Sequence, residues 1–414
     1  MRNRWFIALA AVGIHICIGS VYAWSVLVRP IMATQGFSLK ETTWTFSLAI
    51  LFLGLSAGLL GSFVEKYGPK KSGLIAAAFW GAGMFGTALA LYLHSLPLLY
   101  LFYGVIGGIG LGIGYITPVS TLVKYFPNHR GFATGLAIMG FGFASLIAGP
   151  LMQRLTTAYG LVDNFLVLGI IYMIVMGLSA SYLKAPPEKP SNNPVAPKNS
   201  CLQRGFTENE ALKTWQFSAL WWIFFVNITC GIGLLAVASP MAQEVVGMSP
   251  AEAASLVGII GLFNGAGRIF WSTISDYIGR GYTYVLFFGL ECFAFWKLAT
   301  TADAFGFEVL VLLIITCYGG GFSCMPAYLS DIFGTRKLSA IHGRILTAWG
   351  MAGVAGPYVV SLLRESTSGY TLTLYFFAGC FVINLIIAFF LKHYGARHTT
   401  TAITARQYSA ENPS

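Results

Sequence analysis

Twelve long apolar runs, each closed by charge, proline or a polar turn, constrain the fold of this chain more than any other feature. Most have about the 20 apolar residues that a helix needs to cross a bilayer. Only 10% of the residues are charged, against roughly 25% in soluble globular domains. Such a chain could not cover its surface with polar groups in water, so the sequence predicts an all-α membrane protein with 12 transmembrane helices. The runs are 5–28, 42–64, 71–93, 97–123, 131–153, 163–183, 216–240, 253–275, 282–301, 307–330, 341–363 and 371–391.

A polar stretch between the sixth and seventh runs divides the chain into two sets of six helices. It is rich in Pro, Asn and Lys, a composition typical of linkers. The Thr-rich tail after the last run is expected to be disordered. The expected domains are an N-terminal six-helix half at 1–184, a cytoplasmic linker at 185–215, a C-terminal six-helix half at 216–392 and a disordered cytoplasmic tail at 393–414.

The distribution of lysine and arginine predicts the orientation. If both termini are cytoplasmic, 19 of the 25 basic residues face the cytoplasm, 5 face outward and Arg268 belongs to neither side. This asymmetry accounts for the net charge of +10 without any nucleic-acid partner. The first run lacks a cleavage site after it and should stay as a helix. We expect a monomeric multi-pass protein of a bacterial inner membrane, with both termini cytoplasmic.

The two halves repeat each other's sequence marks. Gly61-Ser-Phe-Val-Glu65-Lys-Tyr-Gly68-Pro-Lys70 follows the second run, and Ser272-Thr-Ile-Ser-Asp276-Tyr-Ile-Gly279-Arg280 follows the eighth, with the acidic residues 211 positions apart. Two prolines of the first half, Pro118 and Pro150, recur 208 and 207 positions later. Several marks at nearly one offset indicate a duplicated six-helix unit, the pattern of secondary transporters.

This repeated motif resembles the Gly-x-x-x-Asp-x-x-Gly-x-Arg/Lys pattern of the major facilitator superfamily. The first copy departs from the pattern at Glu65, and the second begins with Ser272 in place of Gly. The resemblance spans essentially the whole chain and implies two pseudo-symmetric six-helix halves. We expect the acidic residues to pair with basic neighbours and latch the halves in one state. The expected cytoplasmic gating residues are Gly61, Glu65, Gly68, Lys70, Asp276, Gly279 and Arg280.

Arg268 lies in the middle of the eighth run, where an ionisable residue indicates function. Its guanidinium cannot lose its proton and stays a fixed cation near the midplane. No carboxylate of the chain stands at an evident facing position, so a substrate carboxylate held by two parallel hydrogen bonds is the expected partner. The alternative is a structural salt bridge, chiefly with Glu291 of the ninth run.

Polar and aromatic residues in other runs are candidates to surround Arg268. Asn264 lies one turn before it on the same face. A tyrosine in an apolar helix is usually packing plus one hydrogen bond, but several around one cation favour a binding site. The expected substrate-binding residues are Arg268, Asn264, Tyr22, Tyr115, Tyr318, Phe322 and Trp349.

Segments such as Gly19-Ser-Val-Tyr-Ala-Trp24, Lys124-Tyr-Phe-Pro-Asn-His-Arg-Gly131 and Phe263-Asn-Gly-Ala-Gly-Arg268 resemble the oxalate–formate antiporter family and the related monocarboxylate transporters. The resemblance implies that Arg268 binds a substrate carboxylate. In the oxalate carriers a lysine of helix 11 binds a second carboxylate, and the matching position here is Trp349. One cation implies one carboxylate, because a second would be buried without a partner.

Anion uptake against an inside-negative potential costs about 2.3 kcal/mol per 100 mV, so it needs a cotransported cation or an exchanged anion. The animal monocarboxylate transporters carry an aspartate one turn before the arginine, where this chain has Asn264, which cannot titrate. Candidate proton sites are His15, two turns before Tyr22, and Glu291. Alternatively, His15 is a packed histidine bonded to backbone, or the proton rides on the substrate.

Together these features predict a transporter of a small monocarboxylate, lactate- or pyruvate-like, that works by alternating access with proton symport. The alternatives are an oxalate–formate type anion exchanger and a monocarboxylate sensor with a transporter fold. No nucleophile–base pair or metal-ligand cluster occurs within the runs, so we expect neither an enzyme nor a cofactor. The expected partners are the organic anion, protons and the lipid bilayer.

Overall fold

The computed structural model describes residues 3–186, 205–367 and 369–411, which form helices and connecting turns and, within those ranges, no strand. The elements are α1 (Arg4–Gly19), η1 (Ser20–Ala23), α2 (Trp24–Gln35), α3 (Leu39–Tyr92), α4 (Leu96–Leu99), η2 (Tyr100–Gly107), α5 (Gly108–Tyr125), α6 (Arg130–Tyr182), α8 (Glu208–Leu212), α9 (Trp215–Val246), α10 (Pro250–Ile278), α11 (Arg280–Leu298), α12 (Ala304–Phe333), α13 (Leu338–Thr367) and α14 (Thr371–Glu411).

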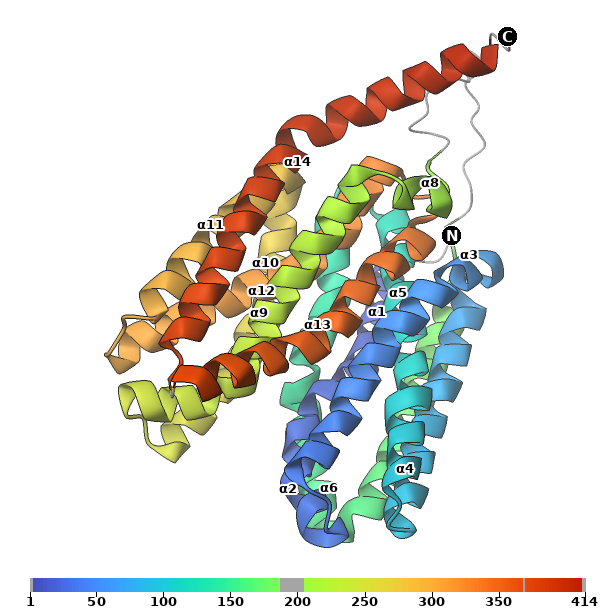
Figure 1. The fold of residues 1–414 in the computed structure, drawn as a ribbon. Coiled ribbons are helices and arrows are strands. Elements are labelled where there is room, and N and C mark those ends of the chain that lie inside the picture. The colour runs from blue at the N-terminus through green and yellow to red at the C-terminus, as the bar shows by residue number, and fades with distance from the viewer. Residues whose placement is uncertain (1–2, 187–204, 368, 412–414) are drawn as a thin grey trace.

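These elements account for the twelve predicted spans. Two helices, α3 and α6, are 54 and 53 residues long, and each turns back at a glycine with positive φ, Gly68 (78°) or Gly160 (86°). A side chain is strained at such a φ, so glycine is favoured where two spans share one turn. Each of these helices therefore holds two spans, as the paired segments of α3 show in Figure 1. The segments α1–η1–α2 and α4–η2–α5 form one span each, and α9 to α14 supply the other six. Of these six, α9, α12, α13 and α14 are long and apolar enough to cross a membrane by length and composition alone.

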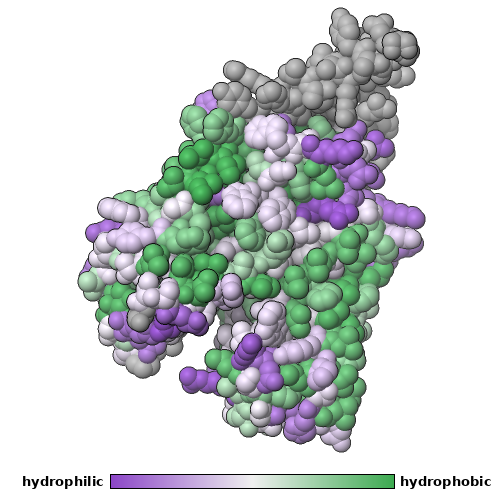
Figure 2. Space-filling view, viewed as in Figure 1, coloured by the Kyte–Doolittle hydropathy of each residue, from purple (hydrophilic) through white to green (hydrophobic). Residues whose placement is uncertain are grey.

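Figure 1 shows the two halves as neighbouring bundles, α1–α6 from blue to green and α9–α14 from yellow-green to red. They meet on the side that carries α8 and the start of α1, which the basic residues predict to be cytoplasmic and which is called cytoplasmic below. Hydrophobic side chains spread over the flanks of both bundles, and hydrophilic ones gather toward the two ends (Figure 2). This surface suits a bilayer.

Glycines bring the two halves into backbone contact at two matched crossings. A Cβ atom at Gly54 of α3 would lie 2.8 Å from the Cα of Gly350 on α13, and one at Gly142 of α6 would lie 2.7 Å from the Cα of Gly265 on α10. The glycines correspond at the repeat offsets, Gly54 to Gly265 and Gly142 to Gly350. Small residues let helices approach this closely. The repeated glycines therefore produce two equivalent contacts between the halves, one between α3 and α13 and one between α6 and α10.

The halves separate toward the outer side. Along α10, which runs from the outer side to the cytoplasmic side, a Cβ at Gly261 would lie 3.4 Å from the Ser145 hydroxyl, and one at Gly258 would have no atom within 4 Å. The outline of the molecule is notched between the halves at that end (Figure 2). The structure is therefore closed on the cytoplasmic side and divergent on the outer side.

The linker and the tail depart in part from the expectation. Within the linker, α8 begins with a capping box of Thr207 and Glu210, and Glu208 accepts from Arg344 Nε of α13 at 2.6 Å. Residues 187–204 and 412–414 of the predicted linker and tail lie outside the described residues. The prediction of a disordered tail differs from the structure, in which α14 continues as helix to Glu411. Residues 402–411 include three alanines, one arginine, one glutamine and one glutamate, all of which favour helix.

Candidate functional site

Arg268 of α10 is fully buried at the interface between the halves, with 0% of its surface exposed. Its Nε donates to Asn264 Oδ1 at 3.2 Å, and its Nη1 donates across the interface to the carbonyl oxygen of Ile138 on α6 at 3.2 Å. Nη2 has no hydrogen-bond partner, and Arg268 forms no salt bridge with any described residue. The expected alternative, an ion pair with Glu291, is therefore not formed here.

Aromatic rings from both halves enclose the guanidinium. Its central carbon lies 5.0 Å from the centre of the Phe322 ring and 5.7 Å from that of Phe141. The indole of Trp349 lies 4.8 Å from the Phe322 ring and 5.4 Å from the Phe141 ring. These rings exclude water and leave the charge with few polar neighbours, an environment in which an anionic partner is strongly favoured.

Three tyrosines complete the cluster. Tyr115 of α5 lies 5.2 Å from the Trp349 ring, and Tyr22 of η1 lies 5.1 Å from the Phe141 ring. The hydroxyls of Tyr22 and Tyr318 lie 3.4 Å apart and join the halves. All seven residues predicted to bind substrate thus share one connected cluster, drawn from η1, α5, α10, α12 and α13.

Glycine spacing makes room for the buried arginine. A Cβ at Gly319 of α12 would lie 2.5 Å from the backbone oxygen of Asn264 and 3.2 Å from Arg268 Cγ. One at Gly142 of α6 would lie 3.2 Å from Arg268 Nε. Larger residues at either position would displace the guanidinium, so these glycines position the site as well as pack the helices.

The two predicted proton-coupling residues lie in different places. His15 of α1 is buried, its Nδ1 is 3.0 Å from the carbonyl oxygen of Ala11, and its ring lies 5.2 Å from Tyr115. The structure therefore places His15 beside the cluster. Glu291 of α11 is also buried, but no hydrogen bond or ion pair among the described residues joins it to Arg268.

Two residues of the cluster were missed by sequence reasoning. Phe141 contacts Arg268, Tyr22 and Trp349, but a phenylalanine in an apolar run carries no distinguishing signal. His342 of α13 is fully buried and lies 6.0 Å from the Tyr115 ring. It sits near the start of its predicted run, close to Lys337 and Arg344, so the sequence did not mark it as intramembrane.

On the cytoplasmic side, each acidic residue of the repeated motif caps a helix of the other half. Asp276 at the end of α10 accepts from the backbone N–H groups of Gly131 (2.9 Å) and Phe132 (2.8 Å) in the first turn of α6. Glu65 of α3 accepts from the backbone N–H of Ser339, in the first turn of α13, at 2.9 Å. Carboxylates are stabilised at helix N-termini by free N–H groups and by the helix dipole.

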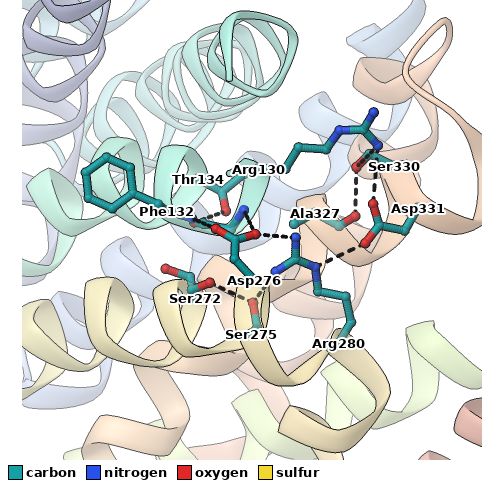
Figure 3. A network of polar contacts seen from close by, with 12 residues as sticks. Arg130, Phe132, Thr134, Ser272, Ser275, Asp276, Arg280, Ala327, Ser330 and Asp331 are labelled. Carbon is teal, nitrogen blue, oxygen red and sulfur yellow. Dashed lines mark hydrogen bonds and ion pairs between the residues drawn. The ribbon is translucent and has the colours of Figure 1, made fainter. Parts of the chain in front are cut away.

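Basic residues surround both acids. Lys124 Nζ lies 3.3 Å from Glu65 Oε2, and Arg280 Nη2 lies 2.5 Å from Asp276 Oδ1. Figure 3 shows Asp331 joined to Arg280 (3.1 Å) and to Arg130 of the other half (3.2 Å). Burial alone would lower the pKa of Arg280, but Asp331 and Asp276 raise it above its ordinary value.

The other predicted gating residues have differing roles in this arrangement. Gly61 is closely packed, since a Cβ there would lie 2.5 Å from the Ser339 carbonyl oxygen. Gly68 and Gly279 have positive φ of 78° and 88° and shape the turns. Lys70 is exposed and takes part in none of the salt bridges found among described residues. In the described chain no three His, Cys, Asp or Glu side chains are placed to hold a metal ion.

Comparison with known proteins gives a family and two kinds of relative. The Major Facilitator Superfamily model matches residues 9–357, and again 229–409. The oxalate:formate antiporter of Oxalobacter formigenes is 30% identical over 86% of this chain and 84% of its own. Monocarboxylate transporter 4 of Gallus gallus is 24% identical over 86% of this chain and 76% of its own. The structure of the proton:xylose symporter XylE superposes with a TM-score of 0.74 at 15% identity, over 94% of this chain and 95% of the symporter.

Proposed function

The chain belongs to the major facilitator superfamily of membrane transporters, and we propose that it moves a small monocarboxylate of the lactate or pyruvate class. Transport proceeds by alternating access of the Arg268 cluster to the two sides of a bacterial inner membrane, with both chain ends in the cytoplasm. The carrier acts as a monomer.

The observation that carries this proposal is the unpaired charge of Arg268. The guanidinium is buried between the halves, has no salt bridge within the described chain and retains an unpartnered Nη2. A carboxylate that binds there neutralises the charge and accepts parallel hydrogen bonds. Because the partner is the cargo, the site gains its counter-charge only when substrate is present.

The remainder of the cluster suits a short acid with a hydroxyl or keto group. Tyr115 has an unpartnered hydroxyl, and Asn264 provides an amide beside Arg268. Phe322, Phe141 and Trp349 offer apolar walls for the carbon chain. Trp349 stands where the resemblance to oxalate carriers implies a second cation, so a dicarboxylate would leave one carboxylate buried without a partner.

We propose proton symport as the form of coupling, with His15 or Glu291 as the proton site. Anion exchange is the second candidate, favoured by the 30% identity to the oxalate:formate antiporter. The external pH during lactate uptake distinguishes symport from exchange. Symport into proteoliposomes makes the external medium more alkaline as lactate enters, whereas exchange needs an internal anion and leaves the pH unchanged.

Uptake of labelled lactate by proteoliposomes tests the central role of Arg268. Arg268→Gln keeps a polar side chain but removes the charge, and a lost charge-assisted pair at a buried site weakens binding by at least about a hundredfold. We expect uptake to be abolished while the variant inserts and remains monodisperse in detergent. Arg154→Gln, an exposed arginine on the outer side, is the control and keeps normal uptake. Near-normal lactate uptake by Arg268→Gln would refute the proposal.

A further inference from the structure

Two buried histidines from opposite halves meet at one tyrosine. The ring of Tyr115 lies 5.2 Å from that of His15 on α1 and 6.0 Å from that of His342 on α13, and all three side chains are 0% exposed. His15 Nε2, both nitrogens of His342 and the Tyr115 hydroxyl have no hydrogen-bond partner. Burying unpaired polar atoms is costly, so four of them at one contact between the halves call for a functional explanation.

We propose that His15 and His342, together with Tyr115, form the proton-binding site of the carrier, and we call these two residues the histidine pair. This inference rests on the proposed function, because it assigns the proton of the proposed symport. It adds His342, from the half that also carries Arg268, and it excludes Glu291 from the coupling.

The histidine pair lies between the Arg268 cluster and the cytoplasmic contacts of Glu65 and Asp276 with the other half, which we call the cytoplasmic seal. His15 and Arg268 both contact the Phe141 ring, at 6.5 Å and 5.7 Å. His342 follows Ser339 by one turn of α13, and Ser339 N–H donates to Glu65 at 2.9 Å. Ionisable groups therefore run from the cytoplasmic surface inward in the order Glu65, His342, His15 and Arg268, which is a short path for proton release.

Few other titratable groups face the pair from the elements packed against it. Arg268 is the cation of α10, and Tyr22 and Tyr318 are the phenols of η1 and α12 that share the cluster. Three charged residues of these elements are held in ion pairs elsewhere: Glu65 of α3 with Lys124 of α5, Arg130 of α6 with Asp331, and Arg344 of α13 with Glu208.

Electrostatics couples the proton to the anion. In the empty carrier, an imidazolium near Arg268 would be repelled by the guanidinium across a medium of low dielectric constant. A bound carboxylate neutralises Arg268 and removes this repulsion, so the anion favours protonation of the pair. By linkage, the proton favours binding of the anion to the same degree. The carrier then crosses with both or with neither, which makes transport electroneutral.

Because the histidines belong to different halves, the conformational change alters their surroundings. When the halves part on the cytoplasmic side, the seal beside Ser339 opens and water reaches His342. The proton then leaves the imidazole nitrogen for water or for the Glu65 carboxylate, and the carboxylate anion leaves Arg268. Glu291 lies on α11, inside the C-terminal half, and bridges no such boundary.

The test compares two assays in proteoliposomes loaded with lactate or with buffer. His342→Asn is the main variant, since neither nitrogen of His342 makes a hydrogen bond that the change would break. We expect its accumulation of labelled lactate driven by a pH gradient, and the alkalinisation that accompanies it, to fall by at least about tenfold, the scale of one coupling free energy. Lactate–lactate counterflow needs no net proton movement, so in His342→Asn it should stay within about threefold of wild type. His15→Asn should give the same results as His342→Asn in both assays.

Glu291→Gln tests the competing candidate for the proton site, and the inference predicts that it keeps both activities. The inference is overturned if His342→Asn takes up lactate with the wild-type alkalinisation per lactate, or if Glu291→Gln alone loses it. If His342→Asn also loses counterflow, its binding of lactate is measured by tryptophan fluorescence between pH 5 and 8. Binding that does not change with pH supports the inference. Binding with the pH dependence of the wild type overturns it. Absence of lactate counterflow in the wild type would instead refute the proposed function itself.

Discussion

At the scale of single residues, Trp349 predicts which acids the site accepts. Its indole Nε1 is buried without a hydrogen-bond partner, and the indole packs against the rings of Phe322 and Phe141. We expect Trp349→Lys to supply the second cation and to raise oxalate uptake relative to lactate by at least about tenfold, because a second buried carboxylate then has a partner. Competition of oxalate against labelled lactate measures this change.

Trp349→Phe is the control for that prediction, since it keeps an aromatic wall and adds no charge. It should reduce lactate uptake modestly and leave oxalate excluded. If the lysine variant discriminates against oxalate as the wild type does, Trp349 does not occupy the position of the second cation.

The residues near Arg268 differ in how far sequence could predict them. Arg268 and Asn264 were predicted because polar side chains are expensive inside an apolar run and therefore conspicuous. Phe141 was not, since only the close approach of α6 to α10 at Gly142 brings its ring to the guanidinium. His342 was missed because its depth depends on where α13 begins relative to the bilayer, which charged neighbours obscure. Side-chain proximity between halves is a tertiary property that no local pattern encodes.

At the scale of elements, the same glycine contact that packs α6 against α10 also positions Arg268. A Cβ at Gly142 would already lie 2.7 Å from Gly265 Cα and 3.2 Å from Arg268 Nε. Gly142→Leu should therefore force α6 away from α10 and displace the guanidinium. Overpacking of this kind costs about 1–3 kcal/mol, so we expect lactate uptake to fall by at least about tenfold, as measured in proteoliposomes at equal protein content.

Gly177→Leu, on the second span of α6, is the comparison for this effect. A Cβ at Gly177 would have no atom within 4 Å, so uptake should remain normal. Equal losses in both variants would mean that leucine harms α6 generally, and that the crossing has no special part in the site.

The twelve spans themselves were predictable because each is a long apolar run, and length and hydropathy alone define a membrane helix. The irregular segments were not. Ser20–Ala23 departs from α-helical geometry where Tyr22 turns toward Tyr318, and Tyr100–Gly107 has the wider π-helical form. Local windings of this kind depend on packing against neighbouring spans. The tail was mispredicted for another reason, since its polar composition outweighed its helix-favouring residues.

At the scale of the whole molecule, the two acidic helix caps predict what sets the balance between outward and inward states. Asp276 joins α10 to the start of α6, and Glu65 joins α3 to the start of α13, so the duplicated motif seals the cytoplasmic side twice. We expect Asp276→Asn to raise the ratio of inward-open to outward-open carrier by about tenfold, since a charged hydrogen bond contributes about 1.5–3 kcal/mol.

Spin labels on Lys71→Cys and Arg336→Cys, in a background without other cysteines, report the separation of the cytoplasmic ends by double electron–electron resonance. Both positions are exposed and lie on opposite halves.

Glu65→Gln should lengthen the same distance between the labels. The double variant should show the sum of the two free-energy changes, because the caps lie at separate crossings and act independently. Asp303→Asn removes an acid that caps α12 within its own half (Asp303 Oδ1 accepts from Gly306 N–H at 2.7 Å) and should leave the distance unchanged. A distance distribution that is the same in the wild type and in the double variant would mean that the glycine crossings alone hold the cytoplasmic side closed.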